Sequence, residues 1–467
     1  MNRLDKQDIL KMLLKSECVT NSIYSVDDIL QWIIERNNEL VVNIKKIPLS
    51  ECSGWRYDEN EGVIRNESGT FFSISGLVQQ NNDVSIEQPI LLQQEIGYLG
   101  ILCSKINGVL HFLMQAKIEP GNINCIQLSP TIQATKSNFT RKHGGKEPAY
   151  LKWFVSADAS NVIVDQIQSE QSSRFLGKRN RNTIIYVEDY TTIEILPSHR
   201  WMTLGQIRKL MRVDNIVNMD SRTVISCIPY STLSQASPNP HCPLFNSVFK
   251  ESSYSDFRKL TRKLNDYKMF DDSTVKTVPL LSLSNWEFKD NAFTCKAEYP
   301  FKVIFCDIEI EGREVRHWHQ PLFEAIGKAT FALVYCDDFG DNVRRFLCKV
   351  TPEIGAFDKI ELGPTIQIEA GTEAAKHDAV TERFFTLLEN KNNIEFDHFL
   401  SEEGGRFYHE QNRNLLIKAS INDFPSLPSD YFWLDYATIN NLIQINNQAN
   451  IQLRNLLSLI EVKSDKI

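Results

Sequence analysis

Six polar residues that recur in two halves of the chain have the chemistry to bind a phosphate. They are Arg174, Arg181 and Asn182 in the first half and, 232 residues further on, Arg406, Arg413 and Asn414. The planar guanidinium group matches the paired oxygens of a phosphate, and a neighbouring amide adds a donor, so such a set suits a diphosphate. Repeated arginines are equally typical of structural ion pairs with carboxylates. The sequence leaves both interpretations open.

Two further basic residues lie in the same segment. Lys178 and Arg179 have Glu410 and Gln411 as counterparts in the second half. Because their positive charge is not shared by the second half, we expect them in a solvated turn, where runs of charge usually lie.

A glutamine and a glutamate also recur. Gln133 and Gln367 each follow a Pro-Thr-Ile run, 234 residues apart. A primary amide both donates and accepts, which suits a nucleobase edge or a sugar hydroxyl, and equally a turn. Glu119 recurs as Glu353. A carboxylate at both places can act as a base or cap a turn, and the adjacent Pro-Gly of the first half favours the turn.

The elements that must position these residues form a duplicated domain. Further matches at the same spacing include Gln88 with Gln320 and Trp201 with Trp433. A period this long exceeds the roughly 20 to 50 residues of a solenoid repeat and predicts two copies of one domain. We expect these copies over residues 50–229 and 281–467.

Two segments are expected outside the copies. Residues 230–280 predict a Ser- and Pro-rich linker followed by an amphipathic helix. Residues 1–49 predict an N-terminal helical segment with two amphipathic helices, which pack on the core or on a dimer mate.

Each copy combines short strands with a few helices. The β-rich runs 97–102 and 330–335 predict strands. The apolar spacing after Thr203 and Asp435 predicts a helix in each copy, because a side-chain oxygen at either position can cap the first turn. The expected fold class is therefore α+β, with a mixed sheet in each copy.

Composition excludes several classes of protein. The chain has 467 residues, of which 42% are hydrophobic and 24% are charged, as in ordinary globular proteins. Its net charge of −8 disfavours general nucleic-acid binding. No apolar run approaches the ~20 residues of a bilayer-spanning helix, and no signal-peptide pattern is present. The ten cysteines include no C-x-x-C pair, so we expect reduced thiols and a cytoplasmic protein.

Cofactor and metal motifs are missing as well. The sequence has no G-x-G-x-x-G after a strand, no phosphate-binding P-loop and no G-x-S-x-G, so no cofactor is expected. His317 and His319 share one face if they lie on a strand. Their sequence neighbours offer no third ligand, so no metal site is expected.

Several unusual strings, in order along the chain, resemble the NDP-hexose 2,3-dehydratase family. They are 115–122, 128–138, 168–171, 178–182, 203–206, 217–222 and 401–408. The resemblance implies two Nudix-like domains that arose by gene duplication, a homodimer, and dTDP-4-keto-6-deoxyglucose as the substrate. The R-E-x-x-E-E-x-G core of the Nudix metal box is absent, which fits a relative without metal-dependent hydrolysis.

The implied reaction needs no redox cofactor. The C4 ketone acidifies the C3 proton, a base removes that proton, donors stabilise the enolate, and the C2 hydroxyl leaves. Tautomerisation then gives a 3,4-diketo-2,6-dideoxy sugar nucleotide. Such a diketone is reactive, so the resemblance implies a 3-ketoreductase that acts next.

The resemblance also suggests roles for single residues. We expect the chemistry in the first copy, because Lys117 has Thr351 as its counterpart. Glu119, His143 and Tyr150 are the candidate bases and acids, and Lys117 is the candidate charge for the enolate. The substrate-binding candidates are Gln133, Arg174, Arg181, Asn182, Trp201, Gln367, Arg406, Arg413 and Asn414.

Two other functions fit the same resemblance. A Nudix-type hydrolase of sugar nucleotides would release a nucleoside monophosphate and would require a metal ion. A non-catalytic sugar-nucleotide-binding protein would leave its ligand unchanged.

Overall fold

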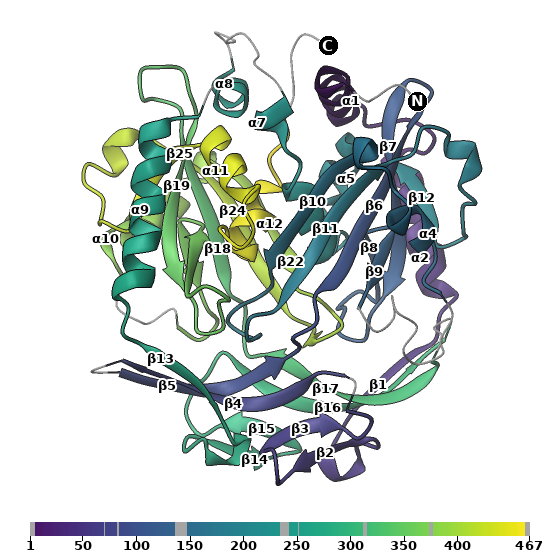
Figure 1. The fold of residues 1–467 in the computed structure, drawn as a ribbon, viewed down its shortest axis with the longest axis vertical. Helices are drawn as coiled ribbons and strands as arrows, with labels where there is room; N and C mark the ends of the chain where they lie inside the picture. The colour runs from purple at the N-terminus through teal and green to yellow at the C-terminus, as the bar shows by residue number, and fades with distance from the viewer. Residues whose placement is uncertain are drawn as a thin grey trace.

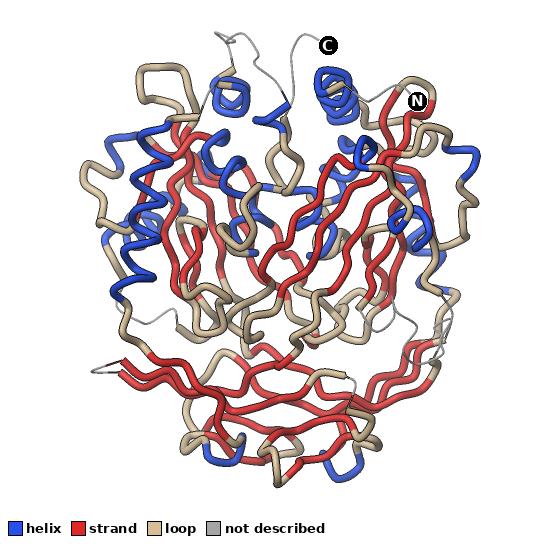
Figure 2. Tube along the Cα trace, in the orientation of Figure 1, coloured by secondary structure: helices blue, strands red, loops and turns tan. Residues whose placement is uncertain are grey.

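The computed structural model describes residues 5–69, 71–81, 84–135, 147–233, 242–250, 252–311, 315–372 and 377–462. Two large mixed sheets lie side by side, and two smaller sheets lie below them in Figure 1. Figure 2 shows that the helices gather around the large sheets, while the lower layer is mostly strand. The fold is α+β with a duplicated architecture, as expected.

The first large sheet belongs to the first copy. Its strands are β6 (Gly97–Ile106), β7 (Val109–Ile118), β8 (Ile126–Ser129), β9 (Ile132–Ala134), β10 (Val162–Ser169), β11 (Arg179–Tyr186) and β12 (His199–Met202). Their order is β10-β11-β6-β7-β12, with β8 paired to β7 and β9 paired to β6.

The second large sheet repeats this plan. Its strands are β18 (Thr330–Cys336), β19 (Arg345–Pro352), β20 (Ile360–Gly363), β21 (Ile366–Ile368), β22 (Ile394–Ser401), β24 (Gln411–Ala419) and β25 (Tyr431–Asp435). Each large sheet contains one parallel pair in the same register: Arg181 lies opposite Tyr98, and Arg413 lies opposite Thr330.

The two small sheets exchange a strand between the copies. One contains β2 (Trp55–Asp58), β3 (Val63–Asn66), β4 (Ser73–Asn81), β5 (Val84–Leu92) and β13 (Thr274–Val278). The other contains β1 (Val42–Ile47), β14 (Trp286–Lys289), β15 (Ala292–Cys295), β16 (Phe301–Ile310), β17 (His317–Ala325) and β23 (Phe407–Tyr408). The N-terminal strand β1 pairs with β16 of the second copy, and β13 pairs with β4 of the first.

The helices cover the large sheets. They are α1 (Lys6–Cys18), α2 (Val26–Asn38), α4 (Leu151–Val155), α5 (Leu204–Leu210), α6 (Met219–Ser226), α7 (Tyr230–Leu233), α8 (Pro243–Phe249), α9 (Tyr254–Phe270), α10 (Ala379–Leu388), α11 (Tyr436–Ile443) and α12 (Ile451–Leu457). The predicted caps are confirmed: Thr203 forms a capping box on α5, and Asp435 accepts the Thr438 N–H on α11. Residues 231–233 belong to α7 rather than to a linker, and 234–241 lie outside the described residues.

The structural repeat begins earlier than the sequence matches. The Ser16 Oγ on α1 accepts the Leu204 N–H at 2.9 Å, and the Ser247 Oγ on α8 accepts the Tyr436 N–H at 2.7 Å. Both serines therefore cap the equivalent helix, α5 or α11, of their own copy. Together with the paired exchange of β1 and β13, these contacts extend the repeat into the segment before residue 50, which the sequence matches alone left outside.

The repeated Pro-Thr-Ile-Gln run has a structural reason. The Thr131 Oγ1 accepts the Leu102 N–H at 2.9 Å and donates to the Leu113 carbonyl, so it bridges β6 and β7. Thr365 bridges β18 and β19 in the same way. A threonine here supplies the partners that two diverging strands cannot give each other.

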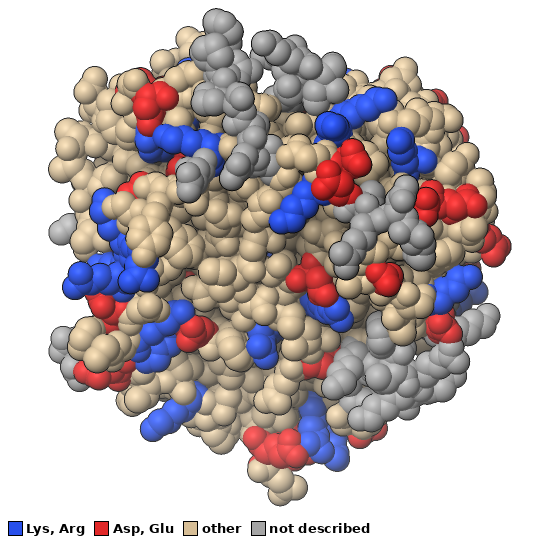
Figure 3. All heavy atoms as spheres, turned by 45° about the horizontal axis from the view of Figure 1, so that its top comes forward, with Lys and Arg blue, Asp and Glu red and all other residues tan. Residues whose placement is uncertain are grey.

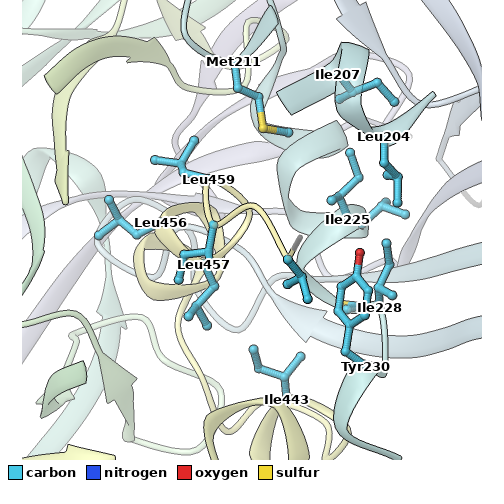
Figure 4. Packing of buried hydrophobic residues seen from close by; sticks show 14 of the residues in the cluster. Leu204, Ile207, Met211, Ile225, Ile228, Tyr230, Ile443, Leu456, Leu457 and Leu459 are labelled. Carbon is cyan, nitrogen blue, oxygen red and sulfur yellow. The ribbon is translucent and has the colours of Figure 1, made fainter. Parts of the chain in front are cut away.

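The largest hydrophobic core is shared by both copies. Figure 4 shows Leu204, Ile207 and Ile225 of the first copy in the same cluster as Leu456 and Leu457 of the second. Burial of each such side chain contributes about 1.5 to 3 kcal/mol. The copies are thus joined by packing as well as by the chain.

The surface carries no large region of one charge on the face shown in Figure 3, where acidic and basic side chains are interspersed. Among the described helices, none is both long and apolar enough to cross a membrane. An anionic ligand would therefore have to bind at a local cluster of cations.

Candidate functional site

Two turns bring the copies together beside the ends of the large sheets. The turn after β7 lies against the second copy. The Gly121 N–H donates to the Gly404 carbonyl at 2.7 Å, and the His409 N–H donates to the Gly121 carbonyl at 2.8 Å. This turn follows directly from Glu119, so the Glu119 carboxylate lies at the boundary between the copies.

The turn after β19 makes the reverse contacts. The Gly355 N–H donates to the Ser172 carbonyl at 2.9 Å, and the Gly177 N–H donates to the Gly355 carbonyl at 2.8 Å. A Cβ at Gly121 would lie 1.7 Å from the Phe407 carbonyl oxygen. Only glycine allows so close an approach of two backbones. Each copy therefore completes a cluster of polar residues in the other.

We call the cluster at the first crossing the lysine cluster. It consists of Lys117, Glu119, Gln133, Glu170, Lys178, Asp220, Glu403 and Arg406. The Lys117 Nζ lies 2.8 Å from the Glu119 Oε1, and the Gln133 Nε2 donates to the same oxygen at 3.3 Å. The residue Glu119 is only 6% exposed. The structure thus holds a carboxylate between a cation and an amide in a place with little water.

Lys178 does not lie in a solvated turn, contrary to our expectation. Its side chain is buried, its ammonium group donates to the Glu95 carbonyl at 2.6 Å, and burial lowers its pKa despite the opposing charge of Glu170. The guanidinium group of Arg406 is close enough to act on the Lys178 charge, and it stacks on the Phe72 ring at 4.2 Å. Two cations from different copies are therefore neighbours, an arrangement that suits an anionic ligand.

Four carboxyl groups share the lysine cluster. Burial is the largest cause that raises the pKa of Glu170 to about 7, and it raises the pKa values of Glu403 and Asp220 as well. A Cβ at Gly405 would lie 2.3 Å from the Glu403 Oε1 and 3.6 Å from the Glu119 Oε1. A side chain at residue 405 would therefore occupy the space beside both carboxyl oxygens, and glycine leaves it open.

We call the cluster at the second crossing the acidic cluster. It consists of Gln171, Arg174, Glu353, Gln367, Glu369, Glu402 and Glu410. The Gln367 Nε2 donates to the Glu353 Oε1 at 2.9 Å, and the Arg174 Nη2 donates to the Glu369 Oε2 at 3.0 Å. Burial raises the pKa of Glu353 to about 8 and that of Glu410 to about 7.

The two clusters differ in charge although their backbones correspond. Lys117 and Lys178 of the lysine cluster have Thr351 and Glu410 at the equivalent positions. Of the residues that define the acidic cluster, only Arg174 is a cation. The lysine cluster is therefore the better match for a diphosphate, and the acidic cluster would repel one.

The repeated Arg-Asn pairs form ion pairs at strand β11 and its counterpart. Arg181 donates two hydrogen bonds to Asp165, both at 2.6 Å, and Arg413 does the same to Asp397 at 2.8 and 2.6 Å. The Asn182 Nδ2 donates to backbone carbonyls of β10 and β11, and the Asn414 Nδ2 donates to the Asn412 carbonyl, likewise in its own strand. Their role in substrate binding stays a prediction.

Tyr150 and Trp201 lie in an apolar cluster of the first copy, separate from the residues that define the lysine cluster. The Tyr150 hydroxyl donates to the Glu194 carbonyl at 2.9 Å and accepts the Leu196 N–H at 3.0 Å, and burial raises its pKa. His143 lies outside the described residues. The structure brings Lys117, Glu119, Gln133 and Arg406 together but does not bring Tyr150 or Trp201 to them.

The two histidines of the second copy have a neighbour that their sequence context did not reveal. The Asp307 carboxylate lies across the β16–β17 pair, with its Oδ1 2.6 Å from the His317 Nε2 and 3.4 Å from the His319 Nε2. The Ser53 N–H donates to the His319 Nδ1 at 2.7 Å. A neutral ring that accepts at Nδ1 carries its proton on Nε2, so that nitrogen has no lone pair for a metal.

The sequence reasoning missed four residues of the lysine cluster: Glu170, Lys178, Asp220 and Glu403. A signal was present for Lys178 and Glu403, because each changes charge at its counterpart, to Glu410 and Gln171. Such a difference between copies marks a place where the two sites diverged, and we had interpreted it as a solvated surface.

Comparison with known families identifies relatives along nearly the whole chain. A family model described as NDP-hexose 2,3-dehydratase matches the chain twice, over residues 26–228 and 258–460. Both matches start before the exchanged strand of their copy, in agreement with the longer structural repeat.

Three curated relatives carry the name dTDP-4-dehydro-6-deoxy-alpha-D-glucopyranose 2,3-dehydratase. The protein of Streptomyces violaceoruber is 36% identical over 93% of this chain and 96% of its own length. The protein of Saccharopolyspora spinosa is 34% identical, over 91% and 89% of the two chains. The protein of Amycolatopsis orientalis is 33% identical, over 98% and 94%.

Proposed function

The chain belongs to the NDP-hexose 2,3-dehydratase family, and on that basis we propose that it removes the C2 hydroxyl group and the C3 proton of dTDP-4-keto-6-deoxyglucose. The protein is a carbon–oxygen lyase of deoxysugar biosynthesis. The observation that carries the assignment to a site is the nearly buried Glu119 carboxylate, held between the Lys117 ammonium and the Gln133 amide.

The lysine cluster contains the groups that the elimination needs. The C4 ketone of the substrate acidifies its C3 proton, and Glu119 removes that proton as the base. The resulting enolate carries its charge on the C4 oxygen, where the Lys117 ammonium stabilises it. Collapse of the enolate expels the C2 hydroxyl, which leaves as water after it gains a proton. The enol product then tautomerises to the 3,4-diketone.

The diphosphate of the substrate binds at the cation pair of the lysine cluster. Lys178 and Arg406 supply two positive charges from different copies, and the ring of Phe72 holds the guanidinium plane. A site with this composition accepts a dTDP-sugar only when both copies are folded against each other.

Several wider features belong to the same proposal. The duplicated mixed sheets are consistent with two Nudix-like domains, and we propose a homodimer and a cytoplasmic location from the family resemblance. The diketone product is reactive, so a 3-ketoreductase should consume it soon after release.

A single incubation distinguishes dehydration from hydrolysis and from binding alone. We would incubate the protein with dTDP-4-keto-6-deoxyglucose, with and without EDTA, and measure the masses of the products. The proposal predicts a sugar nucleotide lighter by one water in both samples. Release of a nucleoside monophosphate that EDTA abolishes would identify a hydrolase, and an unchanged substrate mass would identify a binding protein.

A further inference from the structure

Asp220 is a buried acid that the reaction outlined above does not yet use. It lies in the first turn of α6, behind the cap formed by Asn218, and is 1% exposed. Neither of its carboxyl oxygens has a hydrogen-bond partner among the described residues. A buried polar group without a partner is costly to fold, so its retention calls for an explanation.

Charged groups face Asp220 from each element around it. Lys117 and Glu119 approach from the end of β7, Glu170 from the end of β10, and Glu403 from the second copy. On its own helix, Arg222 is near enough to interact, but its terminal nitrogens donate to the carbonyls of Val217 at 2.7 Å and Ser401 at 2.8 Å.

The charges of the lysine cluster do not balance when every group is ionised. Its four carboxylates exceed its three cations, and all of them are largely removed from water. Carboxylates packed this closely keep at least one proton among them. Burial, and then the charges of Glu170 and Glu403, raise the pKa of Asp220 well above its ordinary value, so Asp220 holds that proton at neutral pH.

The acidic cluster lacks these two acids. The positions of Asp220 and Glu403 are occupied there by Gln452 and Gln171, 232 residues away in each case. An amide fills the same space but has no proton to give. The pair of acids therefore distinguishes the cluster that has the lysines from the one that does not.

We propose that Glu403 donates the proton that lets the C2 hydroxyl leave as water, and that Asp220 is a positioning residue that keeps Glu403 supplied with this proton. The proposal rests on the proposed function. It gives the second copy a direct part in the chemistry of the first, since Glu403 and Glu119 flank the space above Gly405.

The protons balance over one turnover. Glu119 takes the proton from C3, and the electrons of that bond form the enolate. The C2–O bond then breaks, its electrons leave with the oxygen, and Glu403 protonates the leaving hydroxide to water. Asp220 returns a proton to Glu403, and the proton on Glu119 passes back to Asp220. Tautomerisation moves one proton from the enol oxygen to C2, so the enzyme ends as it began.

The test compares Asp220→Asn with the wild type in two reactions. In D2O, we would follow exchange of the C3 proton, which reports the base, and formation of the dehydrated product. We expect exchange to persist while water loss falls by about 10²-fold or more, as for loss of a general acid, with little change in KM. The high-pH limb of the kcat profile should move to lower pH, because Glu403 is then left with its own proton alone.

Glu410→Gln is the matched control, because it converts a buried acid of the acidic cluster to an amide and should leave kcat and its pH profile unchanged. A wild-type rate and pH profile in Asp220→Asn would overturn the proposal, as would equal loss of exchange and water loss. If Asp220→Asn does not fold, Glu403→Gln decides: it should exchange C3 without losing water, and full activity would refute the assignment. A wild-type protein that neither exchanges C3 nor loses water would contradict the proposed function instead.

Discussion

At the scale of single residues, the 2.8 Å contact between Lys117 and Glu119 gives each group a role that neither has alone. The ammonium group keeps the carboxylate ionised and available as a base. The same ammonium lies where negative charge develops once the carboxylate has taken a proton. In the second copy, Thr351 replaces the lysine, so Glu353 has lost this partner.

Replacement of Lys117 by Met tests this role. The apolar side chain keeps most of the volume but removes the charge that stabilises the enolate. We expect kcat to fall by about 10² to 10³-fold, as for removal of one oxyanion donor. Steady-state kinetics would measure this, and a larger effect on KM than on kcat would show that Lys117 serves binding instead.

At the scale of elements, the local features were predictable and the contacts between copies were not. The caps at Thr203 and Asp435 and the strands of each sheet follow from residues close together in the sequence. The exchange of β1 and β13 and the approach of Glu403 to Glu119 join residues more than 200 positions apart. No local pattern of residue types encodes such contacts, so Asp220 and Glu403 escaped notice.

The crossing turns provide a matched pair of variants. A methyl group at Gly121 or at Gly355 would lie 1.7 or 2.0 Å from a carbonyl oxygen of the other copy. Both Gly121→Ala and Gly355→Ala should lower stability by about 1 to 3 kcal/mol, the usual cost of overpacking. Denaturant unfolding would measure this cost. Of the two, only Gly121→Ala should also lower kcat at a temperature where both are folded, and equal loss in both would argue against a special role of the first crossing.

The imidazole of His199 on β12 predicts a pH dependence of stability. Burial lowers its pKa to about 4 in the folded protein, from an ordinary value near 6.5. The unfolded chain therefore binds a proton that the folded protein does not, and stability falls as pH falls from 6.5 to 4. His199→Gln should flatten this fall by up to about 1.4 kcal/mol per pH unit. Unfolding midpoints across this range would test it, and an unchanged slope would show that another group is responsible.

At the scale of the whole molecule, the two copies form one folding and functional unit. They share the largest core, exchange a strand, and complete each other's clusters. This explains why a duplicated chain can change one of its two clusters in charge without losing its fold, since the backbone contacts hold both crossings.

Division of the chain tests this unity. Residues 1–237 and 238–467, expressed together as separate chains, should copurify and retain activity, because the exchanged strands and the shared core hold them together. Either fragment alone should be inactive, since the first lacks Glu403 and Arg406 and the second lacks Lys117 and Glu119. Fragments that purify separately would contradict this prediction, and size-exclusion chromatography would reveal it.

The central claim is that the lysine cluster, and not the acidic cluster, performs the elimination. The most direct measurement is the rate of dehydrated-product formation by Glu119→Gln and Glu353→Gln, two equivalent changes at the equivalent positions. We predict that Glu119→Gln lowers kcat by about 10² to 10⁴-fold, as expected for loss of a base, and that Glu353→Gln retains the wild-type rate. The reverse pattern, or full activity in Glu119→Gln, would contradict the claim.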